Sequence, residues 1–276
     1  MSKENLKHIF LYDKKLWRMN LPNIVVTYRI KNEEKWIKKS LESILDICSE
    51  VVILDDGSTD DTLSICKKFP KVVDINHQEG LPFDETRDRN KLLKMALKRN
   101  PDAILSLDGD EILMPNYKEI LSEELDVFYP EKKIFEFQFL YAWDKYNKIR
   151  YDGLYGKTWQ ARLFRVDKDQ KDLCINKTQY NGNAHCAQIP NNIKGFNKKT
   201  PLEPYSEIKA RSHVKILHYS LFDDNTRQKK FKFCNQLDPN SVEQDGYIHI
   251  ISGKGRHSGP SGMELITIPD FMCRNL

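Results

Sequence analysis

The segment "AILSLDGDEILMPN" (residues 103–116) decides how the chain is interpreted. It begins with "AILSL", a short and almost wholly apolar run of the kind that forms a buried strand. The run ends directly at Asp108, Gly109 and Asp110, so two carboxylates stand at the expected carboxyl end of that strand. They form either an ordinary acidic turn or a place that holds a metal ion.

The paired carboxylates suit a hard divalent cation. Mg²⁺ and Mn²⁺ favour carboxylate oxygens and keep positions open for substrate phosphates. Gly109 lets the backbone approach a ligand closely. An isolated Asp-x-Asp triplet is far more often a solvated turn. Here its position after a buried strand, in a sheet whose other loops are also polar, favours a metal site.

The chain before this segment alternates short β-branched runs with longer amphipathic stretches, as βαβ units do. Strands are predicted at residues 23–28, 51–54, 71–76 and 103–107, and helices at 33–47, 60–69 and 89–99. Short strands that are apolar throughout are typical of a parallel sheet with helices on both faces. We therefore predict an α/β fold with a mostly parallel, Rossmann-like sheet.

Three of the most polar stretches follow predicted strands, at residues 27–32, 55–61 and 108–111. In open α/β sheets, ligands bind beyond the carboxyl ends of the strands, near the point where strand order reverses. If the first and fourth strands are neighbours, these three loops line one crevice. That arrangement predicts a ligand site.

The loop "DDGSTDDT" (55–62) has two interpretations. Gly57 permits a tight turn, and Ser58 or Thr59 can cap the following helix. An exposed carboxylate at the same place can also accept the ring N–H of a uracil or thymine. The residues alone leave both interpretations open.

The pattern weakens beyond about Tyr117. Strands are predicted at 133–143, 158–166 and 214–220, and a polar helix at 225–237. The stretch 176–212 is rich in Asn, Lys, Gly and Pro and is predicted to form loops, and the tail beyond residue 236 is predicted to be irregular.

Composition sets the broad class of the protein. The 276 residues are 39% hydrophobic and 30% charged, and no apolar run approaches the roughly 20 residues that cross a bilayer. The six cysteines include no CxxC pair, which favours reduced thiols over a zinc ribbon or a disulfide framework. "MSKENLKHIFLYDKKLW" (1–17) lacks the apolar stretch of a secretory signal, so a cytoplasmic protein is expected.

Four motifs, in this order and at these separations, resemble the family 2 glycosyltransferases of the GT-A fold. They are "NIVVTYRIKNEEKWIKKSLESI" (23–44), "VVILDDGSTDDT" (51–62), "TRDRN" (86–90) and "ILSLDGDEIL" (104–113). Downstream, "RLFR" (162–165), "NAHC" (183–186) and "ILHYS" (216–220) resemble the bacterial branch that decorates cell-surface polysaccharide and lipopolysaccharide cores.

The resemblance implies a domain plan and a reaction. Residues 1–276 would form a single domain, with a nucleotide-sugar-binding half at 22–116, an acceptor-side half at 117–235 and a tail at 236–276. The enzyme would use Mn²⁺ or Mg²⁺ to move a sugar, with inversion, from a nucleoside-diphosphate sugar to an acceptor hydroxyl. A UDP-sugar is the expected donor, and a glycan or glycolipid the expected acceptor.

The resemblance also assigns residues. The nucleotide pocket would be lined by Thr27, Tyr28, Arg29 and Glu33, with Asp56, and less favourably Asp55, on the base. Arg89 and Asn90 would face the donor. Asp108 would lie near the ribose and the metal, Asp110 would coordinate the metal directly, and His218 would supply a further metal or diphosphate contact. Arg162 is a further substrate-binding candidate, although a solvent-facing strand position is its simpler interpretation.

The catalytic base is left between three candidates, Asp152, His185 and Glu111. It would remove the proton of the acceptor hydroxyl, so it should lie on the acceptor side. Relatives often place a Glu directly after the His that corresponds to His185, but Cys186 stands there in this chain. That departure weakens the assignment of His185.

Three other functions compete. A nucleotidyltransferase would share the sheet and the metal, but its Gly-rich loop after the first strand is missing from "TYRIKNEE" (27–34). A non-catalytic carbohydrate-binding protein could keep the fold, although Asp108 and Asp110 are intact. A nucleic-acid acceptor would explain the basic and aromatic residues of "RQKKFKF" (227–233), which are more simply a solvated helix face.

Overall fold

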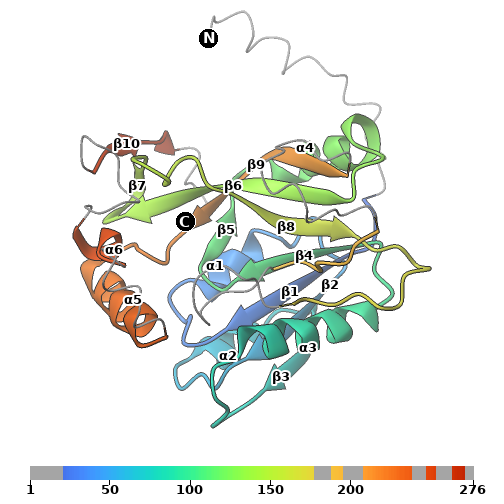
Figure 1. Cartoon of the computed structure of the whole chain (residues 1–276), viewed down its shortest axis with the longest axis horizontal. Coiled ribbons are helices and arrows are strands. Elements are labelled where there is room, and N and C mark those ends of the chain that lie inside the picture. The colour runs from blue at the N-terminus through green and yellow to red at the C-terminus, as the bar shows by residue number, and fades with distance from the viewer. Residues whose placement is uncertain (1–20, 177–187, 195–207, 238–246, 253–262, 271–276) are drawn as a thin grey trace, which may run out of the picture.

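The computed structural model describes residues 21–176, 188–194, 208–237, 247–252 and 263–270, and it contains a 10-stranded sheet (Figure 1). The strands run in the order β10-β7-β6-β8-β4-β1-β2-β3, with β5 paired to β9 and β9 paired to β6. The strands are β1 (Ile24–Ile30), β2 (Glu50–Asp55), β3 (Val72–His77), β4 (Ala103–Asp108), β5 (Glu111–Leu113), β6 (Ile134–Trp143), β7 (Lys145–Arg150), β8 (Trp159–Arg165), β9 (Lys209–His218) and β10 (Leu265–Thr267).

Helices flank this sheet. They are α1 (Ile37–Glu42), α2 (Thr62–Cys66), α3 (Glu85–Leu97), α4 (Tyr117–Glu123), the π-helical turn η2 (Glu124–Phe128), α5 (Asp224–Leu237) and α6 (His249–Ser252). In the described part of the chain, no helix is both long enough and apolar enough to span a bilayer.

The N-terminal half forms four parallel strands in the order β4-β1-β2-β3. The chain enters at β1, builds outward through β2 and β3, and then returns to place β4 on the other side of β1. Strand order therefore reverses between β1 and β4, which is where open α/β sheets bind ligands. The predicted parallel sheet, with its first and fourth strands adjacent, is confirmed.

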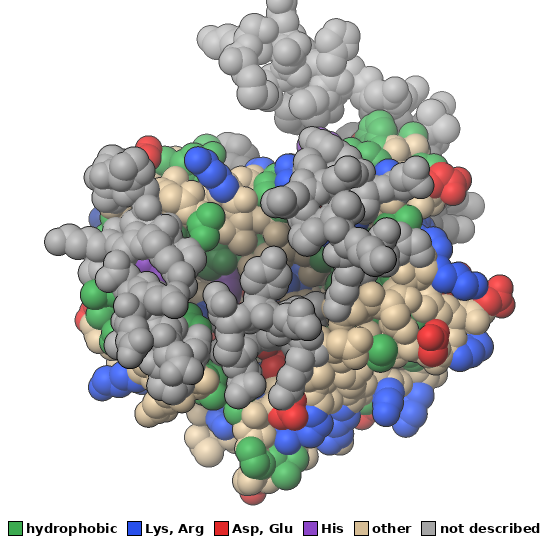
Figure 2. All heavy atoms as spheres, viewed as in Figure 1, with side chains coloured by type: hydrophobic (Ala, Val, Ile, Leu, Met, Phe, Trp, Pro, Cys, Tyr) green, Lys and Arg blue, Asp and Glu red, His purple; other side chains and the backbone are tan. Residues whose placement is uncertain are grey.

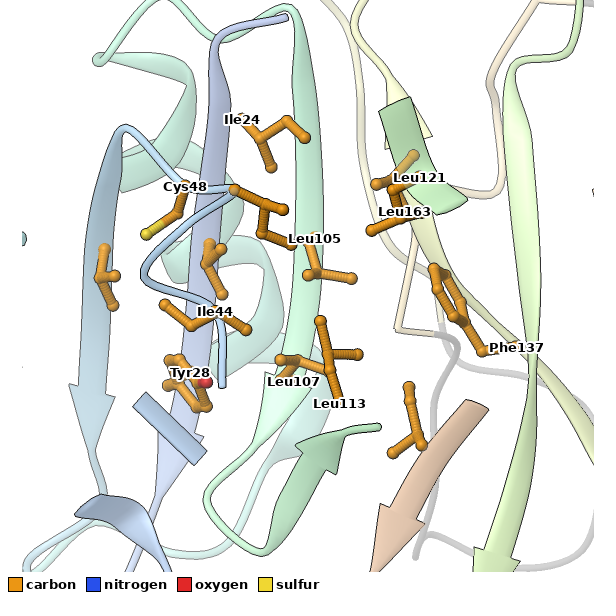
Figure 3. Close-up of a cluster of buried hydrophobic side chains, with 14 of the residues drawn as sticks. Ile24, Tyr28, Ile44, Cys48, Leu105, Leu107, Leu113, Leu121, Phe137 and Leu163 are labelled. Atoms are coloured by element: carbon orange, nitrogen blue, oxygen red, sulfur yellow. The ribbon is translucent and has the colours of Figure 1, made fainter. Parts of the chain in front are cut away.

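Both faces of the parallel strands are covered, as predicted. Ile24 and Tyr28 of β1 and Leu105 and Leu107 of β4 point to the face that carries Ile44 and Cys48, beside α1 (Figure 3). The alternate residues of the same strands pack on the other face against α3, through Val25, Ile104, Leu92 and Leu93. Successive side chains of a strand point to opposite faces, so a strand that is buried on both faces is apolar throughout.

The second half extends the same sheet with a different pattern. β8 pairs antiparallel to both β4 and β6, which joins the two halves. β6 also pairs parallel to β9, and β9 pairs antiparallel to β5. Because β5 follows β4 after only two residues, this pairing brings the end of β9 to the acidic segment that follows β4.

Several predicted bounds were wrong. α1 and α2 are shorter than the predicted 33–47 and 60–69, with turns at their ends, and α3 starts earlier, because Asp84 accepts a hydrogen bond from the backbone N–H of Arg87 and caps it. β9 begins at Lys209, inside the stretch predicted as loops. The tail is not wholly irregular, since it contains α6 and β10, and β10 pairs with β7.

Candidate active site

The predicted polar loops meet at the carboxyl ends of β1, β2 and β4. Arg29 stands beside Asp108 in the β1–β4 register, and Ile30 beside Asp55 in the β1–β2 register. The loop after β1 is bonded to the loop after β2, because Asn32 accepts from the backbone N–H of Thr59 at 2.8 Å. In Figure 2, which has the same view as Figure 1, acidic (red) and His (purple) side chains are visible near the middle of this face.

Asp108 is held by two side chains. A guanidinium nitrogen of Arg89, itself buried, lies 2.5 Å from one Asp108 oxygen, and the Gln188 amide donates to the other at 3.2 Å. Burial acts to raise the pKa of Asp108, but the charges of Arg89, Arg162 and His218, together with the hydrogen bond from Arg89, outweigh it and hold that pKa well below its usual range. Asp108 is therefore an ionised carboxylate in a fixed orientation.

Asp110 meets His218. The Nε2 atom of His218 lies 3.5 Å from an Asp110 oxygen, and the backbone carbonyl of Asp110 accepts from the N–H of Tyr219 at 3.0 Å. Burial acts to raise the pKa of Asp110, and the nearby His218 and Lys230 oppose it and leave that pKa lowered. The Nδ1 atom of His218 is buried and has no hydrogen-bond partner among the described residues.

Glu33, in the loop after β1, forms an acidic cluster with Asp108 and Asp110. A Cβ at Gly109 would lie 2.6 Å from the Glu33 side chain, so only glycine allows this approach. Burial raises the pKa of Glu33 well above its usual range, and the charges of Asp110 and Asp108 add to the rise. Three carboxyl groups thus share one small region.

Asp56 belongs to a polar network at the carboxyl end of β2. It accepts from the guanidinium of Arg29 at 2.8 Å and from the amide of Gln78 at 3.2 Å. Both donors also bond the buried Asp88, each at 3.0 Å. Arg29 lies over the ring of Phe83, 4.8 Å from its centroid. Asp56 therefore has a fixed orientation and is 7% exposed.

Asp55 is held in a fixed orientation within the turn that follows β2. Its carboxylate lies 2.6 Å from Nδ1 of His77, and it also accepts from the backbone N–H and the hydroxyl of Ser58. Asp55 therefore shapes the turn, as the first interpretation of the loop predicted, and the contact of Asp56 with a nucleotide base stays a prediction.

Two predicted binding residues are structural instead. Tyr28 points away from the crevice into the core, where its hydroxyl accepts from Ser40 at 3.0 Å, because it alternates with Thr27 and Arg29 along β1. Asn90 bonds both backbone groups of Ile175, at 2.7 and 2.9 Å, and so anchors the segment after β8 to α3.

Thr27 is also removed from the crevice surface. It is 3% exposed and lines a small cavity beneath Arg89, together with Ser106 and Gln188. The cavity of about 10 Å³ has room for no more than a water molecule. Thr27 is therefore buried beside Arg89 and has little surface open to a ligand.

Glu111 is not free to act as a base. It is fully buried, and both of its oxygens accept from the guanidinium of Arg162, at 2.7 and 3.1 Å. One of them also accepts from the backbone N–H of Asp108 at 3.2 Å. Arg162 is correspondingly occupied, neither solvent-facing nor open to substrate, and this pair fixes the turn that carries the acidic segment.

Asp152 is occupied in the same way. Arg150 donates to its two oxygens at 2.8 and 2.9 Å, and the backbone N–H of Glu264 donates at 3.2 Å. The guanidinium of Arg150 stacks on Tyr155, 3.9 Å from the ring centroid. Asp152 therefore joins the tail to β7 and was wrongly proposed as a base. His185, the third candidate, lies outside the described residues.

The sequence missed several residues that shape the site. Gln78 and Asp88 complete the Asp56 network, and Gln188 holds Asp108. Asp88 lies inside the "TRDRN" motif, so its position was a usable signal. Gln78 and Gln188 come from segments without a motif, and Lys230 comes from "RQKKFKF" (227–233), which was interpreted as a solvated helix face; only the folded chain brings the three together.

A divalent cation would fit at Asp110 and His218. The pair offers a carboxylate oxygen, which suits Mn²⁺ or Mg²⁺, and an imidazole nitrogen, which suits a transition metal such as Mn²⁺ better than Mg²⁺. Within the described ranges, no group of three or more His, Cys, Asp or Glu side chains converges to hold a metal alone. The residues present therefore suit an ion whose remaining ligands come from a bound phosphate.

The sequence matches a known family and several known glycosyltransferases. The model of the family "Glycosyl transferase family 2" matches residues 24–173. The SPbeta prophage-derived glycosyltransferase SunS of Bacillus subtilis is 32% identical over 120 residues, which cover 39% of this chain and 27% of SunS. The dTDP-rhamnosyl transferase RfbG of Shigella flexneri is 31% identical over 102 residues, 34% of each chain.

Solved structures show partial overlaps. S. aureus TarS is 26% identical, with a TM-score of 0.35 over 44% of this chain and 35% of TarS. Glucosyl-3-phosphoglycerate synthase from Mycobacterium tuberculosis, in complex with Mg²⁺ and UDP, is 18% identical, with a TM-score of 0.33 over 44% of each chain.

The chain spans only about a quarter to a third of the length of the curated relatives it matches. The family match nevertheless covers more than half of this chain and includes β1 to β8, with all the acidic residues of the crevice. The chain therefore belongs to glycosyl transferase family 2.

Proposed function

We propose that the protein is a metal-dependent, inverting glycosyltransferase that moves a sugar from a nucleoside-diphosphate sugar to an acceptor hydroxyl. The observation that carries the proposal is the meeting of Asp110 and His218 beside Asp108, at the point where strand order reverses. The crevice would have the fixed carboxylate of Asp56 at one end and a cation site at its centre. This arrangement suits a donor that has a nucleobase at one end and a diphosphate in the middle.

The base of the donor would contact Asp56. Arg29 and Gln78 hold this carboxylate, and each of its oxygens keeps a lone pair for a further donor. A carboxylate is acceptor-only, so it favours a base that presents a ring N–H, as uracil and thymine do. This supports a UDP- or dTDP-sugar.

The ribose and the diphosphate would follow towards Asp108 and Asp110. Asp108 is ionised and oriented by Arg89, which suits it to accept from ribose hydroxyls or from water on a metal. A cation at Asp110 and His218, when bound, would supply positive charge that stabilises the leaving diphosphate. Gly109 keeps the turn close to Glu33 and so fixes where Asp110 stands.

The acceptor would approach from the second half, and we propose a hydroxyl of a bacterial glycan or glycolipid. An inverting transfer needs a base that takes the proton of this hydroxyl. Glu111 and Asp152 are both buried and paired through both oxygens with an arginine, so His185 is the proposal we retain of the three.

The test is donor breakdown with Mn²⁺ present, using a panel of UDP- and dTDP-sugars. We expect release of the free nucleoside diphosphate, and we expect Asp110→Asn to lower this rate by about 100-fold or more, because removal of one electrostatic contact to the developing charge typically costs about that much. Asp169→Asn, in an exposed turn at the opposite end of β4, is the matched control and should keep the wild-type rate.

Other outcomes would assign other functions. Release of pyrophosphate would indicate nucleotidyl transfer. No breakdown of any donor, together with no stabilisation by any nucleotide in a thermal-shift assay, would indicate a non-catalytic protein. An Asp110→Asn variant with unchanged turnover would refute the metal assignment.

A further inference from the structure

Helix α5 stands beyond the carboxyl ends of the parallel strands (Figure 1). It is attached to the N-terminal half at two places. Asp223, just before the helix, lies 2.6 Å from the ammonium of Lys35. Phe233, in its third turn, packs edge-on against Phe83 with ring centroids 5.4 Å apart. The helix therefore has a defined position over the crevice.

The inner face of α5 is marked by two buried residues. Arg227 bonds Asp144 at 2.9 Å and the carbonyl of Leu221 at 3.1 Å, and Cys234 is 3% exposed. Lys230 follows Arg227 by three residues and precedes Cys234 by four, so it shares their face. Its side chain is half-buried, whereas those of Lys229 and Lys232 are exposed.

Lys230 faces the acidic cluster without being paired to it. Burial raises the pKa of Glu33, and burial also acts to raise that of Asp110; in both cases the charge of Lys230 opposes the rise. Yet no described carboxylate lies within salt-bridge distance of its ammonium. This contrasts with Arg89 and Arg162, which are both committed to carboxylates.

The negative charge of the acidic cluster favours a positively charged residue beside a bound diphosphate. Glu33, Asp108 and Asp110 would repel the several negative charges of a diphosphate in a partly buried place, where screening by water is weak. A lysine on a helix that is anchored to the same half supplies a compact positive charge, which is how lysine commonly binds phosphate.

We propose that Lys230 binds the diphosphate of the donor, opposite the side occupied by Asp110. The proposal rests on the proposed function, since it identifies a further residue of the same donor site. It assigns α5 the role of completing the donor site, with the two contacts at Lys35 and Phe83 setting the distance of Lys230 from the strand ends.

The experiment compares ligands that differ only in the diphosphate. Affinities for UDP and dTDP are measured by calorimetry with Mg²⁺, and those for uridine and thymidine by ligand-observed NMR. For Lys230→Ala we expect an about 10- to 100-fold loss of affinity for the diphosphates, the usual worth of a charge-assisted contact, and an unchanged affinity for the nucleosides. Lys230→Arg should recover most of the loss.

Lys232→Ala is the matched control, because it removes the same charge from the outer face of the same helix. It should bind all four ligands as the wild type does. Equal diphosphate affinity in Lys230→Ala and wild type would overturn the role of Lys230 and leave the proposed function standing. A parallel loss of nucleoside and diphosphate affinity, with a lowered melting temperature, would show a structural role and also overturn it. A wild type that binds neither diphosphate would overturn both proposals.

Discussion

The two halves of the sheet use charged residues in opposite ways. In the parallel half, Asp56, Asp108 and Asp110 stand at strand ends and keep oxygens available to a ligand. In the second half, arginines neutralise buried carboxylates through bidentate pairs: Arg162 of β8 meets Glu111 of β5, and Arg150 of β7 meets Asp152. The first arrangement concentrates negative charge at an opening, whereas the second neutralises charge inside the protein.

The difference teaches how to separate functional from structural carboxylates. A carboxylate whose two oxygens both accept from one buried guanidinium, and which no solvent reaches, does not readily take a proton from an acceptor. A carboxylate that is oriented by one or two donors and retains a free lone pair can. By this criterion the second half contributes support at Glu111 and Asp152, and the chemistry lies at the strand ends.

The largest expected effect comes from breaking the Arg162–Glu111 pair. Arg162→Met should lower the free energy of unfolding by about 3–5 kcal/mol, because it leaves Glu111 as an uncompensated buried charge. The double variant Glu111→Gln/Arg162→Met should recover part of this loss. Urea unfolding measures both.

The control for this prediction is Arg99→Met, which breaks the partly exposed ion pair between Arg99 and Glu50. That pair should contribute about 1 kcal/mol or less. If Arg162→Met were no more destabilising than Arg99→Met, the pair would not be structural, and the contrast between the two halves would fail.

A smaller effect is expected from Asp152→Asn, with a defined pH dependence. Burial acts to raise the pKa of Asp152, but the hydrogen bonds and charge of Arg150 lower it overall. Because the pKa is lowered in the folded state, the ionised carboxylate stabilises the fold at pH values above the ordinary pKa of an aspartate. This stabilisation is lost as the pH falls through the lowered value. The variant should therefore lose about 2 kcal/mol at pH 7 and approach the wild type in acid.

Donor turnover per folded molecule completes this test. It should stay within about two-fold of the wild type, whereas loss of a general base typically costs about 100-fold or more. A variant of normal stability and greatly reduced turnover would restore Asp152 as the base.

The smallest effect is expected at His77, which joins the two sides of the turn that carries Asp55. Its ring nitrogens lie 2.6 Å from Asp55 and 2.9 Å from Glu79. The hydrogen bonds to these two carboxylates raise the pKa of His77, and the bond to Glu79 has the larger effect. Because the pKa is raised in the folded state, the charged imidazole stabilises the fold at pH values below the ordinary pKa of histidine. This stabilisation is lost as the pH rises through the raised value. His77→Ala should thus lower the melting temperature more at pH 6 than at pH 9.

Glu79→Gln provides the control, since it should reduce this pH dependence and leave the Asp55 contact in place. A larger loss at pH 9 than at pH 6 would mean that His77 acts through packing and not through its charge.

The N-terminal fold was predictable because local pattern and tertiary arrangement agree there. An apolar run such as residues 103–107 has few alternatives to a buried strand, and the residues that end it mark the carboxyl end of the sheet. The second half offers no such signal. β10 has only three residues and exists because it pairs with β7, and the start of β9 is fixed by its pairing with β6.

The direction of side chains within a strand was the second feature that could not be predicted from the sequence. Thr27, Tyr28 and Arg29 are consecutive in one motif, yet Tyr28 faces the core and Arg29 the crevice. Both faces of β1 are buried, so hydropathy along the strand carries no alternation from which the two directions could be read.

The sequence by itself determined the βαβ order, the parallel half and the acidic segment after β4, because each depends on residues that are near one another in the chain. Only the tertiary structure decided that Glu111 and Asp152 are neutralised, that Gln78 and Gln188 orient carboxylates, and that Lys230 faces the crevice. Those relations join residues that are distant in sequence or differ only in direction, and distance and direction in space are set by packing.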